Sequence, residues 1–513
     1  MLSIVYVIWG AWFIFRSSFV DYSGVRHFLL FDDGMISLKY ALNIANGFGP
    51  VWNIGEFVEG FSNPLWTLIM SFFICVFGRD LAPLCIQLMA LLLLTLSGFY
   101  IYKLASIITT QSGNKESPFT LLSSVLFFSY YPVSYWSLSG MEVSLLVFLT
   151  IVTTYIILKH IYIQVNKYIY VNVFILISIA YVIRPDGFLV LLPLLGMLLL
   201  KEYKSESISL VKVSSMLIFC CTILTVSLWR YYAYHDIFPN TYYLKIDGYD
   251  LLWRLQNGIG FITPYLKQMS LFIIMSIMFS IYMFRNDGNA LWFWLLMMPL
   301  ISIAYQVYVG GDPWNRWRQL SPSVFILFLP AAIIPSLIST NLFPRVICLS
   351  VLGLSFCFSN YKFVREQLYG KLYSFSEQHK QLQFALDLNK VTTRNASVGV
   401  FWAGTIPYYF HGLSIDMLGK CDKYISHLVP NKHPSWGGMN GVPGHSKFDL
   451  EYSIKQLQPD WIQDYKWSKQ DLQTYTKEKY VKVKNDERVL PGCFKKGSNN
   501  IIWDKLVVIS ECK

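Results

Sequence analysis

The run LAPLCIQLMALLLLTLSGFYIY, from Leu81 to Tyr102, decides the fold class, because it contains no Asp, Glu, Lys or Arg. As a helix it is long enough to cross a hydrocarbon core of roughly 30 Å. The whole chain has the same bias, with 54% hydrophobic and only 14% charged residues among 513. A soluble protein of this size needs more charge to solvate its surface. The sequence therefore predicts an integral membrane protein.

Similar apolar runs recur on both sides of this one, up to about Asn360. They predict an all-α polytopic bundle of about eleven or twelve helices in residues 1–360. The N-terminal run, Leu2–Phe15, has no upstream basic region and no clear cleavage site. We therefore expect it to be a retained helix rather than a signal peptide. The other runs are Leu2–Phe15, Phe61–Phe77, Phe119–Val133, Val143–Leu158, Ile169–Ile183, Phe188–Leu200, Val211–Leu228, Met269–Phe284, Leu291–Val309, Ser323–Ile338 and Val346–Phe358.

Short linkers rich in Lys and Arg orient the bundle, because such linkers face the cytoplasm. We then expect three large segments on the opposite, outer face: loop one (21–60), the loop 229–267 and the C-terminal tail. One conflict remains. If residues 61–102 crossed the membrane twice and Phe119–Val133 crossed it once more, loop one and Glu142 would lie on opposite faces. We therefore expect one segment between Phe61 and Val133 to be re-entrant or half-length. The cytoplasmic linkers carry Lys159 and Lys167, Lys201 and Lys204, Arg285, and Arg345.

The tail, residues 361–513, is polar and predicts a separate extracytoplasmic domain. Ser397–Trp402, Ser414–Leu418 and Trp461–Gln463 are expected strands, which indicates a small α/β or mixed domain. Its three cysteines, Cys421, Cys493 and Cys512, permit one disulfide without indicating which pair forms.

The net charge of +11 is typical of positive-inside bias and contact with anionic membrane lipids. No nucleic-acid-binding motif is present, so no nucleic-acid partner is predicted. The chain also lacks GxGxxG, Walker A, GxSxG and HExxH motifs. A nucleotide donor is therefore not indicated, and we expect a membrane-borne activated substrate.

Loop one contains an acidic pair, Asp32 and Asp33. The stretch that follows is rich in glycine, which implies tight turns of the backbone. Adjacent carboxylates repel at low dielectric, so one pKa tends to rise towards neutrality, as a general base requires. The alternatives are a solvated loop, or Asp32 capping a helix that starts near Gly34.

Four further polar clusters lie on the same predicted face: Ser139–Glu142, Arg184–Gly187, His235 with Pro239–Lys245, and Gly310–Arg318. Each alone is typical of a structural ion pair or interfacial anchor, but acids and bases gathered on one face favour a site. Arg and Lys suit a phosphate, whereas Trp and Tyr suit a sugar or lipid headgroup. Candidates for the donor phosphate and sugar are Arg316, Arg318, Lys245, Arg184, Asn240, Tyr243 and Asp312. Candidates for acceptor binding or positioning are Glu56, Glu59, Asn63, Glu142, His235 and His445.

These motifs resemble a known family. Loop one, from Asp32-Asp33 through Gly55-Glu56 and Val58-Glu59-Gly60 to Ser62–Trp66, is similar to the first outer loop of the terminal β-(1→2) arabinofuranosyltransferases of the mycobacterial cell wall. These enzymes form a branch of the GT-C glycosyltransferases. The likeness continues in Ser139–Glu142, Arg184–Gly187, Pro239–Lys245, Gly310–Asp312, Asp416–Gly419 and Pro443–His445.

The resemblance implies a GT-C bundle that transfers a sugar from a polyprenyl-phosphate donor with inversion. The sugar would be a pentofuranose such as arabinose, or a hexose. The acceptor would be a cell-surface glycan, or a lipid-linked or protein acceptor, at the outer face of a bacterial inner membrane. Asp32 would be the base and Asp33 its positioning partner. The resemblance implies no certain cofactor, and it leaves a divalent metal open, which would bind at Asp33. In the relatives a single Arg follows the Gly-Gly-Asp motif, at a spacing that neither Arg316 nor Arg318 matches.

Two other functions are compatible with the composition: a transporter or flippase of lipid-linked glycan, and an O-antigen-type polymerase. A transporter often shows internal repeats, and none is found here. A polymerase is expected to lack both the acidic pair and the tail. The tail itself is expected to serve the acceptor through Trp402, Tyr408, Tyr409, Trp436 and His445, with a purely structural role for these aromatics as the alternative.

Overall fold

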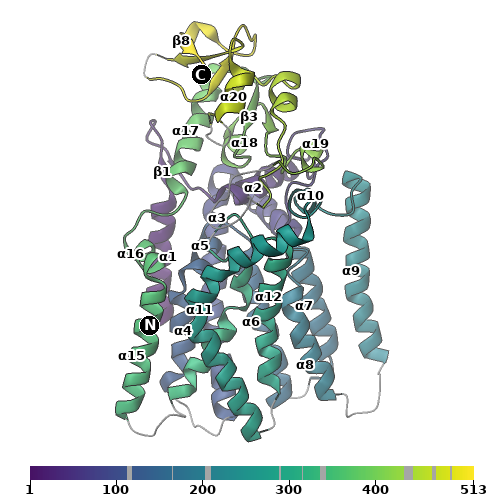
Figure 1. Cartoon of the computed structure of the whole chain (residues 1–513), viewed down its shortest axis with the longest axis vertical. Coiled ribbons are helices and arrows are strands. Elements are labelled where there is room, and N and C mark those ends of the chain that lie inside the picture. Colours follow the sequence, from purple (N-terminus) through teal and green to yellow (C-terminus); the bar gives the residue numbers. More distant parts are fainter. Residues whose placement is uncertain are drawn as a thin grey trace.

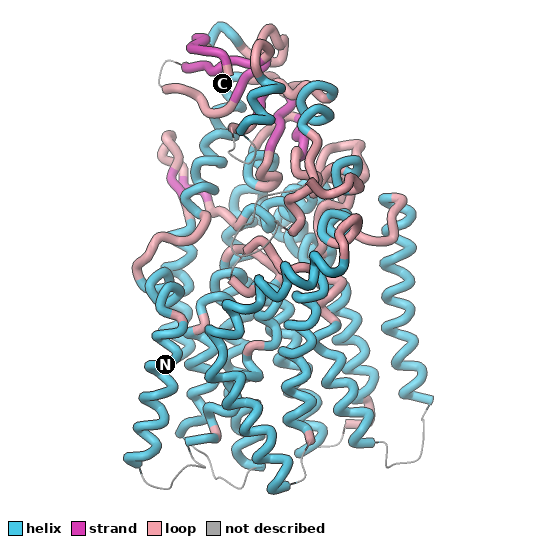
Figure 2. The backbone as a smooth tube through the Cα atoms, in the orientation of Figure 1, coloured by secondary structure: helices cyan, strands magenta, loops and turns pink. Residues whose placement is uncertain are grey.

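The structure is a computed structural model of the whole chain. It describes all residues except 112–117, 164–165, 203–209, 288–289, 315, 336–341, 432–442, 465–468, 486–487 and 513. Figure 1 shows long helices side by side, with a smaller part of the chain mounted at one end of them. That smaller part holds nearly all of the strands (Figure 2).

The apolar runs form most of the long helices. The helices of the bundle are α1 (Leu2–Ser17), α3 (Pro64–Gln111), α4 (Leu122–Ser129), α5 (Tyr131–Leu138), α6 (Val143–Tyr162), α7 (Ile169–Ile183), α8 (Leu192–Glu202), α9 (Leu210–Tyr234), α11 (Leu251–Asp287), α12 (Leu291–Val309), α13 (Phe325–Phe328) and α15 (Leu342–Ser359). Shorter elements join them: the hairpin β1 (Phe19–Val20) and β2 (Arg26–His27), α2 (Asp32–Ala45), α10 (Asn240–Lys245), and the 3-10 turns η1 (Pro118–Leu121), η2 (Leu189–Leu191), η3 (Arg318–Ser323) and η4 (Leu329–Ala332).

The chain is a multi-pass membrane protein, and its apolar helices differ in length. Among the described residues, five helices are long and apolar enough to cross a membrane, or six if one helix pair bent by 81° is counted as a span. Four more apolar helices are shorter, at 10–17 residues. The expected run Ser323–Ile338 is not one regular helix where it is described: η3, α13 and η4 divide it as far as Ala332, and residues 336–338 lie outside the described part of the chain.

Two of the expected runs, Phe61–Phe77 and Leu81–Tyr102, belong to one long element, α3, which breaks at Gly78 (φ 78°, ψ 168°). Just before α3, Asn63 Nδ2 donates to Glu142 Oε2 at 2.9 Å. Just after the break, the Tyr408 hydroxyl of the C-terminal domain donates to the Arg79 carbonyl at 2.8 Å. Both ends of the first half therefore lie at the end of the bundle that carries this domain. A first half with both ends at one end of the bundle is the arrangement that the predicted re-entrant or half-length segment requires.

The C-terminal domain contains a mixed six-stranded sheet of order β4-β3-β5-β7-β6-β8. Strand β3 runs parallel to β4 and β5, and the remaining pairs are antiparallel. This confirms the strand-containing domain and the three expected strands. Cys493 and Cys512 form a disulfide, which leaves Cys421 as a buried thiol. The elements are α16 (Tyr361–Leu368), α17 (Phe375–Val391), β3 (Ser397–Val400), α18 (Thr405–Tyr409), β4 (Leu413–Asp416), α19 (Lys423–Ser426), the π-helix η5 (Glu451–Gln456), β5 (Trp461–Ile462), α20 (Lys469–Thr476), β6 (Tyr480–Lys484), β7 (Cys493–Lys495), η6 (Trp503–Lys505) and β8 (Val507–Glu511).

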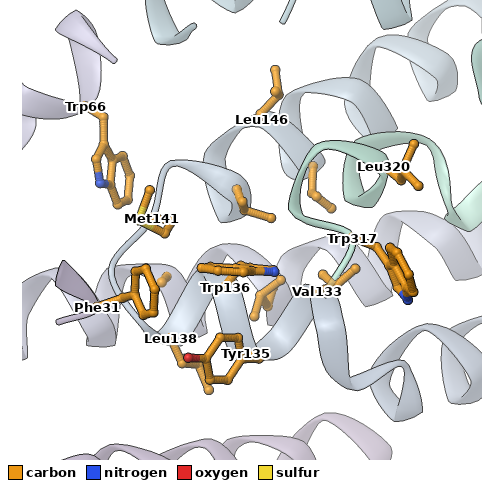
Figure 3. Close-up of a cluster of buried hydrophobic side chains, with 14 of the residues drawn as sticks. Phe31, Trp66, Val133, Tyr135, Trp136, Leu138, Met141, Leu146, Trp317 and Leu320 are labelled. Carbon is orange, nitrogen blue, oxygen red and sulfur yellow. The ribbon is translucent and has the colours of Figure 1, made fainter. Parts of the chain in front are cut away.

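A cluster of buried hydrophobic side chains includes Phe31, the residue before α2, together with Trp66 and Trp136 (Figure 3). The Phe31 ring meets Trp136 edge-on at 5.1 Å and Trp314 at 5.0 Å between centroids. Trp66 Nε1 donates to the Gly140 carbonyl at 2.9 Å. Edge-to-face aromatic packing of this kind fixes orientation as well as burying area. It therefore fixes the point at which the acidic pair begins.

Candidate active site

The acidic pair occupies the first two positions of α2, where the bundle meets the C-terminal domain (Figure 1). Phe31, the residue before the helix, has an extended conformation, and its amide donates to the Ser139 carbonyl at 2.8 Å. Successive residues of a helix point about 100° apart. Asp32 and Asp33 therefore face different parts of the protein although they are adjacent in the sequence.

Asp32 faces the C-terminal domain. Its side chain is 5% exposed, and its Oδ1 accepts a hydrogen bond from the Thr405 amide at 3.0 Å. The expectation that Asp32 might cap its own helix is wrong, because α2 has no side-chain cap. An ideal Cβ on Gly404 would lie 2.1 Å from the Asp32 carbonyl oxygen, so only glycine fits there. Burial raises the pKa of Asp32 to about 7.

Asp33 faces the bundle and is held by two cations. Arg318 Nη1 lies 2.8 Å from its Oδ2, and Lys420 Nζ lies 2.8 Å from its Oδ1. Burial alone would raise the pKa of Asp33, but these two cations outweigh it and hold the pKa well below its usual range. The pair is thus divided into one fixed anion and one group that titrates near neutrality. Such a division is typical of acid–base sites.

A chain of opposite charges extends from Asp33 along the bundle side. Arg318 Nη2 lies 3.1 Å from Asp312 Oδ2, and Lys245 Nζ lies 3.9 Å from the same oxygen. Arg184 bridges Glu142 at 2.7 Å and Asp186 at 2.6 Å. Because 3.9 Å is too long for a hydrogen bond, Lys245 is the least engaged of these cations among the described residues.

Two cavities meet at this charged chain. The larger has a volume of about 370 Å³ and combines the cations with an apolar wall from Phe188, Tyr305 and Tyr308. The smaller has a volume of about 50 Å³ and lies against the C-terminal domain, with Asp32 in its wall. Residues that line both are Asp33, Pro313, Trp314, Lys420, Gly444 and His445.

Several predicted site residues come together around the larger cavity. The residues from the predicted set that line it are Asp33, Asn63, Arg184, Lys245, Asp312, Arg318 and His445. Glu142 supports this wall by accepting from Asn63 and pairing with Arg184. Burial lowers the pKa of His445 to about 4, so its imidazole is neutral at pH 7. A neutral imidazole can donate one hydrogen bond and accept another.

Several predicted site residues lie outside both cavities and have partners elsewhere. Arg316 turns the other way, towards Glu366, with its guanidinium 3.7 Å from the Tyr373 ring centroid. Tyr243 stacks on His427 at 4.2 Å.

Glu56 accepts from Asn53 at 2.9 Å and lies outside both cavities. His235 is exposed and lines neither cavity. Glu59 forms a buried ion pair with Arg230 at 2.8 Å, and its carbonyl accepts from the Asn240 amide at 3.0 Å. The Asn240 side chain in turn holds carbonyls of the C-terminal domain. Glu59 and Asn240 thus support the site from behind.

Sequence reasoning missed Lys420 and the Thr405 amide, both contributed by the C-terminal domain. One signal was available for Lys420, because it directly follows the Asp416–Gly419 motif. A metal at Asp33 finds little support, since both carboxylate oxygens are engaged by cations. Within the described part of the chain, no group of three or more His, Cys, Asp or Glu side chains is arranged to hold a metal ion.

Comparison with known proteins identifies the fold. The model of one family, "Domain of unknown function (DUF8728)", matches residues 367–499, inside the C-terminal domain. No curated protein matches the chain. The chain is similar to the Archaeoglobus fulgidus oligosaccharyltransferase tethered with an acceptor peptide containing the NVT sequon, with a TM-score of 0.55, 11% identity, and coverage of 99% of this chain and 76% of that one.

The chain is also similar to ArnT from Cupriavidus metallidurans in the apo state, with a TM-score of 0.51, 13% identity and 96% coverage of both chains. Both solved structures are GT-C glycosyltransferases. At such low identity the likeness concerns the fold alone. It confirms the expected GT-C-type bundle with a C-terminal strand-containing domain.

Proposed function

We propose that the chain is a membrane glycosyltransferase that uses a polyprenyl-phosphate sugar and inverts its anomeric centre. One observation carries the proposal: an acidic pair, split into a fixed anion and a titratable carboxyl group, lies where a cationic cavity meets a second cavity. Transfer to a hydroxyl needs a base near neutral pKa beside a site for an anionic leaving group. The GT-C fold and the family resemblance of loop one agree with this chemistry.

The donor would occupy the larger cavity. Its phosphate would meet Lys245 and Arg318, with Arg184 behind them. Lys245 is the strongest of these candidates, because its ammonium lines the cavity and its nearest carboxylate is 3.9 Å away. The apolar wall from Phe188, Leu189 and Tyr308 suits the first isoprene units of the lipid. The cavity volume of about 370 Å³ is adequate for a sugar phosphate and part of its lipid.

The chemical step would pass through Asp32. Its carboxylate takes the proton of the acceptor hydroxyl while the hydroxyl oxygen attacks the anomeric carbon of the donor. The bond between that carbon and the phosphate oxygen breaks, and polyprenyl phosphate leaves with the electron pair. Attack and departure on opposite faces of the sugar invert the configuration. Lys245 and Arg318 offset the charge that develops on the phosphate.

The acceptor would enter through the smaller cavity. Trp314 and Trp402 lie in its wall with ring centroids 5.9 Å apart, and His445 meets Trp314 edge-on. Aromatic faces of this kind bind sugar rings. This supports a glycan acceptor, with a pentofuranose or hexose as the transferred sugar. Tyr408 and Tyr409 are less suitable, because both are buried beside Arg79, and Trp436 lies outside the described residues.

The same proposal places the enzyme in a bacterial inner membrane, with its site and C-terminal domain on the periplasmic side. Two described cations support this orientation. Helix α6 begins next to Glu142 of the cavity wall and carries Lys159 in its last turn, at the opposite end. Helix α11 contacts Gly310 near its start and carries Arg285 in its last turn. A reporter fused after the last residue should be active only outside the cytoplasm. A cytoplasmic signal would reverse the orientation.

A direct assay separates the candidate functions. Purified protein in nanodiscs is mixed with a labelled polyprenyl-phosphate sugar, with and without an acceptor glycan. We expect the label to move to the acceptor and unlabelled polyprenyl phosphate to accumulate. A flippase would move the donor across vesicles without transfer, and a polymerase would extend a lipid-linked glycan. Failure of transfer across a panel of pentose and hexose donors would contradict the proposal.

A further inference from the structure

The C-terminal domain delivers one cation to the acidic pair through a tight turn, residues 416–422, which we call the docking turn. Asp416 is 1% exposed and fixes the turn from inside. Its Oδ1 accepts from the Leu418 amide at 3.0 Å, and its Oδ2 accepts from the Cys421 amide at 2.7 Å. Gly419 has a φ of +79°, which favours glycine. The backbone on both sides of Lys420 is therefore fixed.

The docking turn is also held from outside, by two separate elements of the bundle. Asn240 Nδ2 donates to the Gly419 carbonyl at 2.9 Å and to the Lys420 carbonyl at 3.0 Å. An ideal Cβ on Gly60 would lie 2.6 Å from Cys421 Sγ. Loop one therefore packs so closely against the turn that no side chain fits at residue 60. These contacts specify where the Lys420 side chain begins.

From this position Lys420 reaches back into the bundle. Its Nζ lies 2.8 Å from Asp33 Oδ1, and Arg318 takes the other oxygen of the same carboxylate. Its side chain is 25% exposed and lines both cavities. The charged or titratable groups around Lys420 and Asp33 come from α2, α10, η3, the docking turn itself and the segment beyond it: Asp32 and Asp33, Lys245, Arg318, Asp416, Cys421, and His445.

We propose that Lys420 is a positioning residue of the acidic pair: its ammonium holds Asp33 as a fixed anion and thereby leaves Asp32 as the single proton acceptor. This inference rests on the proposed glycosyl transfer. Without Lys420, Asp33 would keep only one cation, and two neighbouring carboxyl groups would compete for one proton. Like charges so close cannot both ionise easily. The domain would then be a part of the catalytic centre rather than a platform beside it.

The charge can be removed with little change of shape in Lys420→Met, and Lys420→Arg retains it. Lys423→Met is the matched control, because Lys423 follows the same turn but pairs with Asp236, at 2.7 Å, outside both cavities. For Lys420→Met we expect kcat to fall about ten- to a hundredfold, the usual effect of losing a charge-assisted hydrogen bond. Lys420→Arg should recover most of the rate, and the control should match the wild type.

The dependence of kcat on pH distinguishes charge from simple tethering. Loss of a neighbouring cation makes ionisation of Asp33 and Asp32 harder, so their pKa values rise. The low-pH limb of the profile should therefore move to higher pH by about one unit in Lys420→Met and return in Lys420→Arg. The assay uses the full-length protein in nanodiscs with a donor that the wild type has been shown to transfer.

Each outcome decides the question. A shifted limb with a slower rate supports the inference. Wild-type kcat in Lys420→Met would overturn it, and so would a slower rate with an unmoved limb, which would make Lys420 only a tether for the domain. The wild-type arm keeps the two proposals apart: if the wild type transfers no sugar, the glycosyltransferase proposal fails before any variant is compared.

Discussion

Replacing Asp32 by Asn separates the role of base from that of a domain contact. The Asn side chain keeps an amide oxygen that can accept from the Thr405 amide, as Asp32 Oδ1 does at 3.0 Å. Docking of the C-terminal domain should therefore survive. The substitution removes only the ability to take a proton, because an amide is not basic in this pH range.

The two roles differ in magnitude. A single neutral hydrogen bond contributes about 0.5–1.5 kcal/mol, which corresponds to about tenfold at most. A positioned general base contributes about 10² to 10⁴ in rate. Donor affinity should stay unchanged, since Asp32 is not among the residues that line the larger cavity. We therefore expect Asp32→Asn to lose at least about a hundredfold in kcat with normal donor binding.

The wild-type pH profile gives a second check on the same residue. A pKa of about 7 for Asp32 means that the active, ionised form is lost as the pH falls. The rate should drop about tenfold for each pH unit below that value and level off above it. Asp32→Asn should show no such limb. Turnover near the wild-type level in Asp32→Asn would refute the assignment, and Asp33 would be the next candidate.

Stability should change in the opposite direction from activity. The pKa of Asp32 is raised from 3.8 to about 7 in the folded protein, so between these values the folded state binds more protons than the unfolded state. Stability from this group is therefore present at low pH and is lost as the pH rises towards 7. Asn carries no charge, so Asp32→Asn should be at least as stable as the wild type at pH 8. Thermal unfolding in detergent at pH 5 and pH 8 measures this.

Three further outcomes are expected. Lys245→Met should raise the donor KM about ten- to a hundredfold by removing a phosphate contact, while Lys423→Met leaves it unchanged; equal KM values would put the phosphate elsewhere. Gly404→Ala should reduce kcat, because the added Cβ would lie 2.1 Å from the Asp32 carbonyl oxygen; normal activity would mean that the two segments can separate freely. Removing residues 361–513 should abolish transfer yet leave donor binding measurable by calorimetry, since the main phosphate candidates precede residue 361; loss of binding in a folded truncation would contradict this division.

The bundle could be predicted from the sequence because apolar runs report directly on burial in lipid. The break in α3 left a mark in the sequence, because Gly78, Arg79 and Asp80 separate two apolar runs, but hydropathy does not reveal that one helix bends there. Hydropathy describes the environment of a segment and not its direction. The topological conflict around loop one was the indirect sign that one segment does not cross.

The acidic pair was predictable for a local reason, and its partners were not. Asp32 and Asp33 are adjacent, so their mutual repulsion can be read from the sequence alone. Lys420 is 387 residues away from Asp33, and a single sequence contains no information on such a contact. His445 was predicted as a site residue of the tail and Lys420 was not, although both line the larger cavity.

The two arginines after the Gly-Gly-Asp motif illustrate how local backbone geometry decides a role. Trp317, between them, has a left-handed conformation with φ 54° and ψ 34°. This reverses the direction of the chain, so Arg318 reaches Asp33 whereas Arg316 pairs with Glu366. Non-glycine residues seldom adopt this conformation, and no pattern in the sequence announces it.

Charge balance gives the reason why the two parts of the chain must act together. Loop one supplies the buried Asp32 and the partly buried Asp33 but neither of the cations that hold Asp33: Arg318 comes from the bundle and Lys420 from the C-terminal domain. A buried pair of like charges is costly unless something separates the two groups in protonation. The two cations keep Asp33 ionised, whereas burial of Asp32 favours its protonated form. An acidic pair with these properties exists only when the domain is docked, which ties proton transfer to the part of the protein that would receive the acceptor.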